Sequence, residues 1–187
     1  MAGLFQEATL AGGCFWCLES AFNQLQGVEK ASSGYANGHI AHPSYREVCS
    51  GSSGHAEVIR LRYNPEEISF REILEVFFAL HDPTQLNRQG HDIGTQYRSG
   101  VYYHNEEQRL IAEAIIREIE DEQIWPGKVV TEVEPIQSYY PAEDYHENYF
   151  ERNPENQYCQ AVVSPKLAKF RQTFAAKLKP VISAQAS

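Results

Sequence analysis

One stretch near the N-terminus constrains the path of the chain more than any other. Residues 8–11 are small or apolar, Gly12 and Gly13 follow, and apolar side chains then recur from Leu18 at spacings of three and four residues. This pattern predicts a strand, a tight turn and a helix. Cys14 then lies at the helix N-terminus, where unpaired backbone N–H groups and the helix dipole favour a thiolate over a thiol. Such a position suits a nucleophilic cysteine.

Predicted strands and helices interleave along the rest of the chain. The expected strands are residues 55–63, 101–103 and 129–136, and the expected helices are residues 70–82, 106–122 and 166–178, with a short helix within 141–150. Residues 27–45 are rich in Gly, Ser, Asn, His and Pro and are expected to form a loop with short extended pieces. The fold class is therefore α+β: a two-layer α/β sandwich with a mixed sheet flanked by helices and a long irregular C-terminal segment.

Length, composition and charge limit the possible functions. With 187 residues, of which 42% are apolar and 22% charged, we expect one catalytic domain over residues 1–187. The net charge of -9 argues against nucleic acid and anionic membranes as partners, because both attract clustered Lys and Arg. No basic leader and no run of about 18 apolar residues is visible, so we expect a cytoplasmic monomer without a membrane span.

The four cysteines are too few and too unevenly spaced for a secreted disulfide scaffold, so we expect free thiols. Cys14 and Cys17 have the C-x-x-C spacing of redox pairs, but the favoured interpretation of Cys17 is a buried helix residue. Cys49, in a predicted turn, is expected to be inert. Zinc would require a second Cys or His pair at ligand spacing, and the sequence has none, so no metal is expected.

Several polar residues are candidates for acid–base and binding roles. Glu57 shares the strand face of Ile59 and Leu61, and partial burial there would raise the pKa of its carboxyl. Asp92 and Tyr97 lie in a polar, turn-rich segment of the kind that carries function. Alone, each has an ordinary structural explanation, such as a solvated carboxylate, a turn residue or a core tyrosine. Their combination favours a functional site with acid–base and binding residues.

Four blocks of sequence together carry a resemblance to a known family. They are Gly13-Cys14-Phe15-Trp16, Tyr45-Arg46-Glu47-Val48-Cys49-Ser50-Gly51, Gly54-His55-Ala56-Glu57 and Gly94-Thr95-Gln96-Tyr97-Arg98-Ser99. From about residue 8 to residue 174 the chain resembles the A family of peptide methionine sulfoxide reductases. The resemblance implies thiol-dependent repair of oxidative damage, in which methionine S-sulfoxide, free or in proteins, is reduced to methionine.

The resemblance also implies roles for particular residues. It implies that Cys14 is the nucleophile, Glu57 the acid and Cys159 the resolving thiol, that Phe15 and Trp16 hold the substrate methyl group, and that Tyr45, Asp92 and Tyr97 bind and polarise the sulfoxide oxygen. It implies no bound cofactor, with thioredoxin as the external dithiol reductant. Many family members have glycine in place of Cys17, and the absence of a cysteine after Cys159 implies a two-thiol cycle.

Residues 153–160 are turn-like, and Pro154 with its polar neighbours predicts a mobile segment that carries Cys159 to the nucleophile. Two alternatives remain at this point. The chain could be a general thiol–disulfide oxidoreductase that uses Cys14 and Cys17, or a non-catalytic module whose Phe15 and Trp16 capture a peptide side chain. The first gives no task to Glu57 and the tyrosines.

Overall fold

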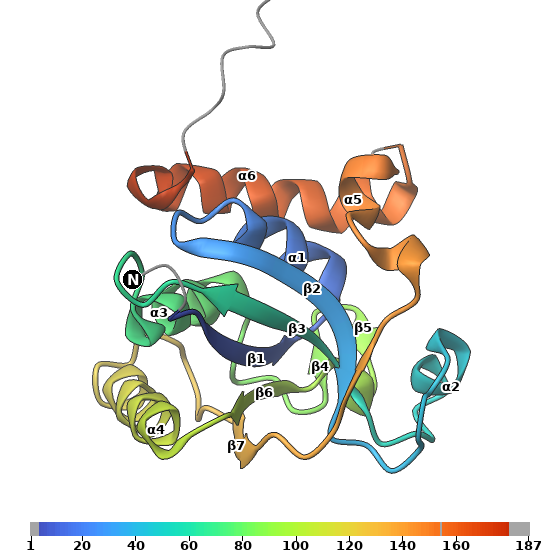
Figure 1. The fold of residues 1–187 in the computed structure, drawn as a ribbon, viewed down its shortest axis with the longest axis horizontal. Helices are drawn as coiled ribbons and strands as arrows, with labels where there is room; N and C mark the ends of the chain where they lie inside the picture. The colour runs from blue at the N-terminus through green and yellow to red at the C-terminus, as the bar shows by residue number, and fades with distance from the viewer. Residues whose placement is uncertain (1–3, 154, 180–187) are drawn as a thin grey trace, which may run out of the picture.

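A computed structural model describes residues 4–153 and 155–179 of the 187-residue chain. One curved sheet dominates it, with the strand order β7-β6-β1-β3-β2-β8 (Figure 1). The strands are β1 (Gln6–Gly12), β2 (Val28–Ala36), β3 (Ala56–Tyr63), β6 (Ser99–Tyr103), β7 (Glu132–Pro135) and β8 (Tyr139–Pro141). Strands β6 and β7 pair in parallel and the other neighbours pair antiparallel, so the sheet is mixed. A separate hairpin joins β4 (Arg88–Gln89) to β5 (Asp92–Ile93).

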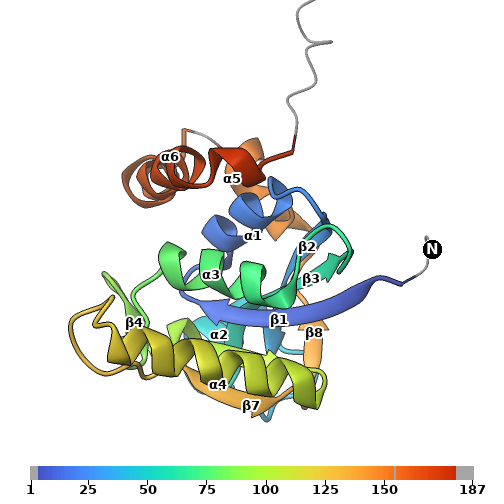
Figure 2. The ribbon, with the colours of Figure 1, turned by 90° about the vertical axis from the view of Figure 1, so that its left-hand side faces the viewer.

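Four longer helices bury their apolar faces in the main core. They are α1 (Phe15–Asn23), α3 (Phe70–Leu80), α4 (Glu106–Asp121) and α6 (Ser164–Thr173). Both views show α6 running beside α1, and the two helices are in contact (Figures 1 and 2). The shorter elements are α2 (Tyr45–Cys49), α5 (Tyr149–Arg152), the 3-10 turns η1 (Thr95–Tyr97), η2 (Asp144–His146) and η4 (Ala175–Lys177), and the π-helical turn η3 (Cys159–Val163).

Helix starts are encoded locally. Ser69 caps α3 by accepting a hydrogen bond from the Glu72 backbone N–H at 3.0 Å, and the Glu72 carboxylate accepts the Ser69 N–H at 3.1 Å. This reciprocal capping box satisfies two backbone donors that the helix itself leaves free. Asn105 caps α4 in the same way, through the Gln108 N–H at 2.9 Å. Both helices begin where the sequence predicts.

The predicted α+β class, with a mixed sheet flanked by helices, is confirmed. The largest error concerns residues 27–45, where the expected loop is wrong because β2 spans nine of these residues and pairs with both β3 and β8. Its small residues are required by packing rather than by a turn. A Cβ on Gly34 would lie 2.3 Å from the Tyr139 ring. The ring can therefore pack against β2 at this position only because glycine has no side chain.

Other predicted boundaries shift by a few residues. The strand expected at 129–136 is confined to β7, and the last long helix begins at Ser164 and ends at Thr173. The C-terminal segment carries short helical turns, and Pro154 lies outside the described residues. Within the described part of the chain, each helix is too short or too polar to cross a lipid bilayer.

The close approach at Gly34 gives a prediction about stability. Gly34→Ala forces the added methyl group against the Tyr139 ring, and we expect the free energy of unfolding, measured with urea, to fall by about 1–3 kcal/mol. In a Tyr139→Ala background the same change should cost much less, because the ring is gone. An equal cost in both backgrounds would show that the contact does not determine this residue.

Candidate active site

Cys14 lies where β1 turns into α1, as the sequence predicts. Gly13 makes this turn with a φ of +91°, and a Cβ there would lie 2.8 Å from the Gln89 side chain, so only glycine fits. Cys14 follows as the residue that caps α1, in an extended conformation and partly exposed. The Trp16 backbone N–H lowers the pKa of its thiol. The helix start therefore favours the thiolate, as expected.

The thiol is nevertheless harder to ionise than predicted. Burial raises the pKa of Cys14 well above its usual value, and the nearby Glu57 carboxylate raises it further. The Trp16 N–H lowers the pKa but does not outweigh these two effects. The helix terminus favours the thiolate, as expected, but burial outweighs it, and the desolvation cost of the site was not visible in the sequence.

Glu57 lies on β3, next to the start of α1. Its carboxylate Oε1 accepts the Phe15 backbone N–H at 3.2 Å, and its side chain is 1% exposed. Burial raises the pKa of Glu57 to about 8, although the Phe15 hydrogen bond opposes the shift. The predicted inward-facing carboxyl with a raised pKa is confirmed. A carboxylic acid that is protonated at neutral pH beside a free thiol can act as a proton donor.

Tyr45, Asp92 and Tyr97 come from α2, β5 and η1, and the fold brings them to the same place. Burial raises the pKa of both tyrosines, and the Glu57 charge raises both further. Asp92 and Cys14 are also close enough to Tyr97 to raise the pKa of its hydroxyl. Both tyrosines therefore remain neutral hydroxyl donors at physiological pH.

The two aromatic residues after Cys14 differ in burial. Phe15 is fully buried, whereas Trp16 is half-buried and stacks on Tyr149 with ring centroids 3.9 Å apart. The Trp16 indole N–H donates to His146 Nδ1 at 3.0 Å, and the His146 ring also lies against Tyr45 at 4.4 Å. These contacts fix the indole beside the nucleophile. They form an apolar wall of the kind that could hold a methyl group.

Sequence reasoning missed three residues of the segment 141–150. His146 and Tyr149 support Trp16, and Glu143 joins two elements of the site. The Glu143 carboxylate accepts the Tyr35 hydroxyl from β2 at 2.8 Å and the Tyr45 backbone N–H from α2, also at 2.8 Å. The only available signal was the unusual density of aromatic and acidic residues in this segment.

Cys159 opens η3 and is fully buried rather than placed on a turn-like loop. Burial raises the pKa of its thiol, and the Glu151 carboxylate raises it further. The preceding residue, Tyr158, reaches the site: its hydroxyl donates to the Asp92 carboxylate. The structure therefore brings the segment of Cys159 to the nucleophile, with both cysteines as free thiols.

The remaining thiol of the C-x-x-C motif is a helix residue of the core. Cys17 is 4% exposed, and burial raises its pKa to about 11, against a lowering effect of Lys166. This confirms the favoured interpretation of Cys17 as a buried helix residue, and a thiol so hard to ionise is a poor exchange partner at neutral pH. Among residues 4–153 and 155–179, no group of three or more His, Cys, Asp or Glu side chains could hold a metal ion.

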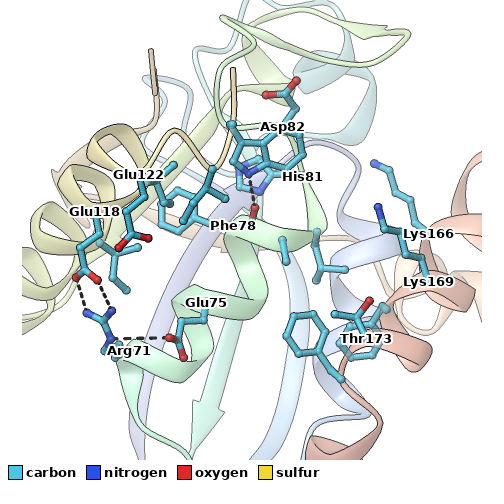
Figure 3. A pocket seen from close by; sticks show the side chains of 18 of the residues that line it. Arg71, Glu75, Phe78, His81, Asp82, Glu118, Glu122, Lys166, Lys169 and Thr173 are labelled. Atoms are coloured by element: carbon cyan, nitrogen blue, oxygen red, sulfur yellow. Dashed lines mark hydrogen bonds and ion pairs between the residues drawn. The ribbon is translucent and has the colours of Figure 1, made fainter. Parts of the chain in front are cut away.

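A groove of about 680 Å³ lies away from this cluster, between α3, α4 and α6 (Figure 3). At one side of the groove Arg71 of α3 pairs with Glu118 of α4 at 2.8 Å, and the described lining includes no cysteine. His81 at one end hydrogen-bonds the Phe77 carbonyl and the Ser99 hydroxyl, each at 2.7 Å, so both ring nitrogens are engaged. The reactive groups are therefore at Cys14 and not in this groove.

Comparison with known proteins agrees with this geometry. The family model for peptide methionine sulfoxide reductase matches residues 6–178. The peptide methionine sulfoxide reductase MsrA of Polynucleobacter asymbioticus is 52% identical over 175 residues, which cover 94% of this chain and 92% of the relative. Reduced Mxr1 from Saccharomyces cerevisiae has a TM-score of 0.77 and 36% identity, over 85% of this chain and 91% of that chain.

Mxr1 from the same yeast has also been solved in complex with Trx2. That structure matches with a TM-score of 0.55 and 28% identity, over 80% of this chain and 87% of that chain. The family match covers nearly the whole chain and includes all the candidate site residues: Cys14, Phe15, Trp16, Tyr45, Glu57, Asp92, Tyr97 and Cys159. The chain belongs to the peptide methionine sulfoxide reductase family.

Proposed function

We propose that the chain reduces methionine S-sulfoxide, in proteins or as the free amino acid, with Cys14 as nucleophile and Glu57 as proton donor. One observation carries the assignment of these roles: a buried carboxyl group with a pKa of about 8 lies beside a free thiol that caps a helix. A sulfoxide is a weak electrophile until its oxygen is protonated or strongly hydrogen-bonded, so the reaction needs this pair.

In the first step, Glu57 gives its proton to the sulfoxide oxygen while the Tyr45 and Tyr97 hydroxyls stabilise the charge that develops there. Cys14 releases its thiol proton to solvent and its sulfur attacks the sulfoxide sulfur, while Phe15 and Trp16 hold the methyl group. The sulfoxide sulfur gains two electrons and departs as methionine. Cys14 loses two electrons and becomes a sulfenic acid, and Glu57 is left as a carboxylate.

In the second step, the Cys159 thiol condenses with the sulfenic acid to form a disulfide and release water. Cys159 is buried in this thiol form, so its segment has to rearrange before the two sulfurs can bond. We propose thioredoxin as the external reductant of that disulfide. Support comes from the yeast relative solved with Trx2.

We also propose that the chain acts as one catalytic domain, as a monomer in the cytoplasm, without a bound metal or organic cofactor. The continuous family match over residues 6–178 supports the single domain. The chemistry supports the absence of a cofactor, because two thiols and one carboxyl group complete the electron and proton balance.

Turnover of the two separate sulfoxide epimers with dithiothreitol tests the proposed function. We expect reduction of the S epimer and not of the R epimer. Reduction of the R epimer alone would contradict the proposal. Methionine sulfoxide binding that survives thiol alkylation, with no turnover at all, would favour the non-catalytic binding module.

The two cysteine roles predict different defects. Cys14→Ser should produce no methionine, because no sulfur nucleophile remains. Cys159→Ser should still produce about one methionine per enzyme in a single turnover, since the chemistry precedes disulfide formation. Repeated turnover of Cys159→Ser with thioredoxin would remove Cys159 from the resolving role, as would a Cys14–Cys17 disulfide as the only oxidised product in mass spectrometry.

The acid role predicts a pH dependence. The wild-type rate of single-turnover reduction should rise with pH as Cys14 ionises and level off above about 8, because Glu57 then loses the proton that it must donate. Glu57→Gln should lower the rate on the order of 100- to 10,000-fold and remove this levelling, so that its rate keeps rising with pH. Glu134→Gln, at an exposed position of the edge strand β7, is the same type of substitution and should behave as wild type. A near-normal rate of Glu57→Gln at neutral pH would contradict the acid role.

A further inference from the structure

One histidine touches three of the residues that are expected to bind the substrate. His146 belongs to the turn η2, and its side chain is fully buried. Its ring centroid lies 4.4 Å from that of Tyr45, 5.1 Å from that of Phe15 and 5.9 Å from that of Trp16. His146 therefore contacts both residues of the expected methyl wall, Phe15 and Trp16, and one tyrosine that is expected to bind the oxygen. It has no part in the proposed chemical steps.

Two contacts of different kinds hold the Trp16 indole. The indole stacks on the Tyr149 ring with only 9° between the two planes, and this contact fixes the plane of the indole. Stacked rings can still slide past one another, because the contact favours no single direction within the plane. The hydrogen bond from the indole N–H to His146 Nδ1, at 3.0 Å, is directional. His146 therefore determines where the edge of the indole lies.

This hydrogen bond also fixes the protonation state of the histidine. An indole N–H can only donate, so Nδ1 has to accept, and the ring proton is on Nε2. Among the described residues Nε2 has no hydrogen-bond partner, and the Glu143 carboxylate Oε1 lies 4.0 Å away. A ring without nitrogen would avoid this unpaired donor but would leave the indole N–H without its acceptor. The advantage of histidine is therefore the direction that it gives to Trp16.

We propose that His146 is a positioning residue that makes the site selective for the methyl group of the substrate, because its unprotonated Nδ1 holds the edge of the Trp16 indole in place. This inference rests on the proposed function, which assigns the methyl wall to Phe15 and Trp16.

A wall that cannot move discriminates against a larger alkyl group. One extra methylene changes recognition by an apolar pocket by roughly 10- to 200-fold. An indole that is stacked but not hydrogen-bonded can slide and admit an ethyl group with little loss. The preference for a methyl over an ethyl sulfoxide therefore reports on the hydrogen bond between Trp16 and His146, and not on the chemistry at Cys14.

The selectivity should also depend on the charge of His146. A proton on Nδ1 would bring two N–H groups face to face and break the bond to the indole. The titratable groups that face the ring are the Glu143 carboxylate and the phenols of Tyr45, Tyr145 and Tyr149, whereas α1 presents two rings that do not ionise. Phenols are uncharged near neutral pH. Burial lowers the pKa of His146 more than Glu143 raises it, so the imidazole is neutral at physiological pH.

Two substitutions separate the acceptor from the packing of the ring. His146→Phe keeps an aromatic ring and removes the acceptor, whereas His146→Asn places an oxygen on Cγ, where Nδ1 was. The ratio of kcat/KM for methionine S-sulfoxide to that for ethionine S-sulfoxide is measured with dithiothreitol. We expect a ratio of about tenfold or more for the wild type and His146→Asn, and of about threefold or less for His146→Phe. Urea unfolding confirms that each variant is folded, and His146→Leu replaces His146→Phe if that variant is not.

The same substitution in a second background tests whether His146 acts through the indole. A Trp16→Phe enzyme has no N–H to hold, so His146→Phe should leave its ratio unchanged. A further fall of the ratio in that background would overturn the inference, as would a ratio in His146→Phe equal to that of the wild type, or a wild type without preference for the methyl group.

Nitrogen-15 NMR follows the hydrogen bond without substrate. The chain has two tryptophans, so Trp125→Phe identifies the Trp16 indole signal. We expect this signal to shift in His146→Phe and to titrate in the wild type with a midpoint below the ordinary histidine value of about 6.5. An indole signal that does not respond to His146→Phe would overturn the inference. Failure of the proposed function is a different result, because the wild type would then reduce neither sulfoxide while the indole signal still reports the bond.

Discussion

The hydrogen bond from the Phe15 backbone N–H to the Glu57 carboxyl is the interaction on which the site depends. It joins the first turn of α1 to β3 across 3.2 Å and fixes the acid beside Cys14. The bond alone would favour the ionised carboxylate, but burial outweighs it and raises the pKa of Glu57 to about 8. The fold thus keeps a carboxylic acid neutral at a pH where most glutamates are charged.

This neutral acid also controls the nucleophile. While Glu57 is protonated it does not repel a charge on Cys14, and the Trp16 N–H at the helix start is free to stabilise a thiolate. Once Glu57 has given up its proton, its negative charge raises the pKa of the thiol. A site with one negative charge is therefore favoured over a site with two.

The sequence predicted the parts of this site that depend on local pattern. The spacing of apolar residues predicted the turn and helix around Cys14, and the residue types around Ser69 predicted its capping box. The alternation of side chains along the strand predicted that Glu57 faces inward. The sequence did not predict β2, whose small residues serve the packing of Tyr139, or the support of Trp16 by His146. Those contacts join segments more than 100 residues apart, and a local pattern holds no information about them.

The protonation state of Glu57 in the reduced enzyme is the most direct test of this account. Carbon-13 NMR of labelled glutamate carboxyl groups, with the Glu57 signal assigned by its loss in Glu57→Gln, follows its titration. The account predicts a protonated carboxyl at neutral pH with a midpoint near 8. A midpoint at or below the ordinary glutamate value of about 4.3 would contradict it, because Glu57 would then have no proton to donate.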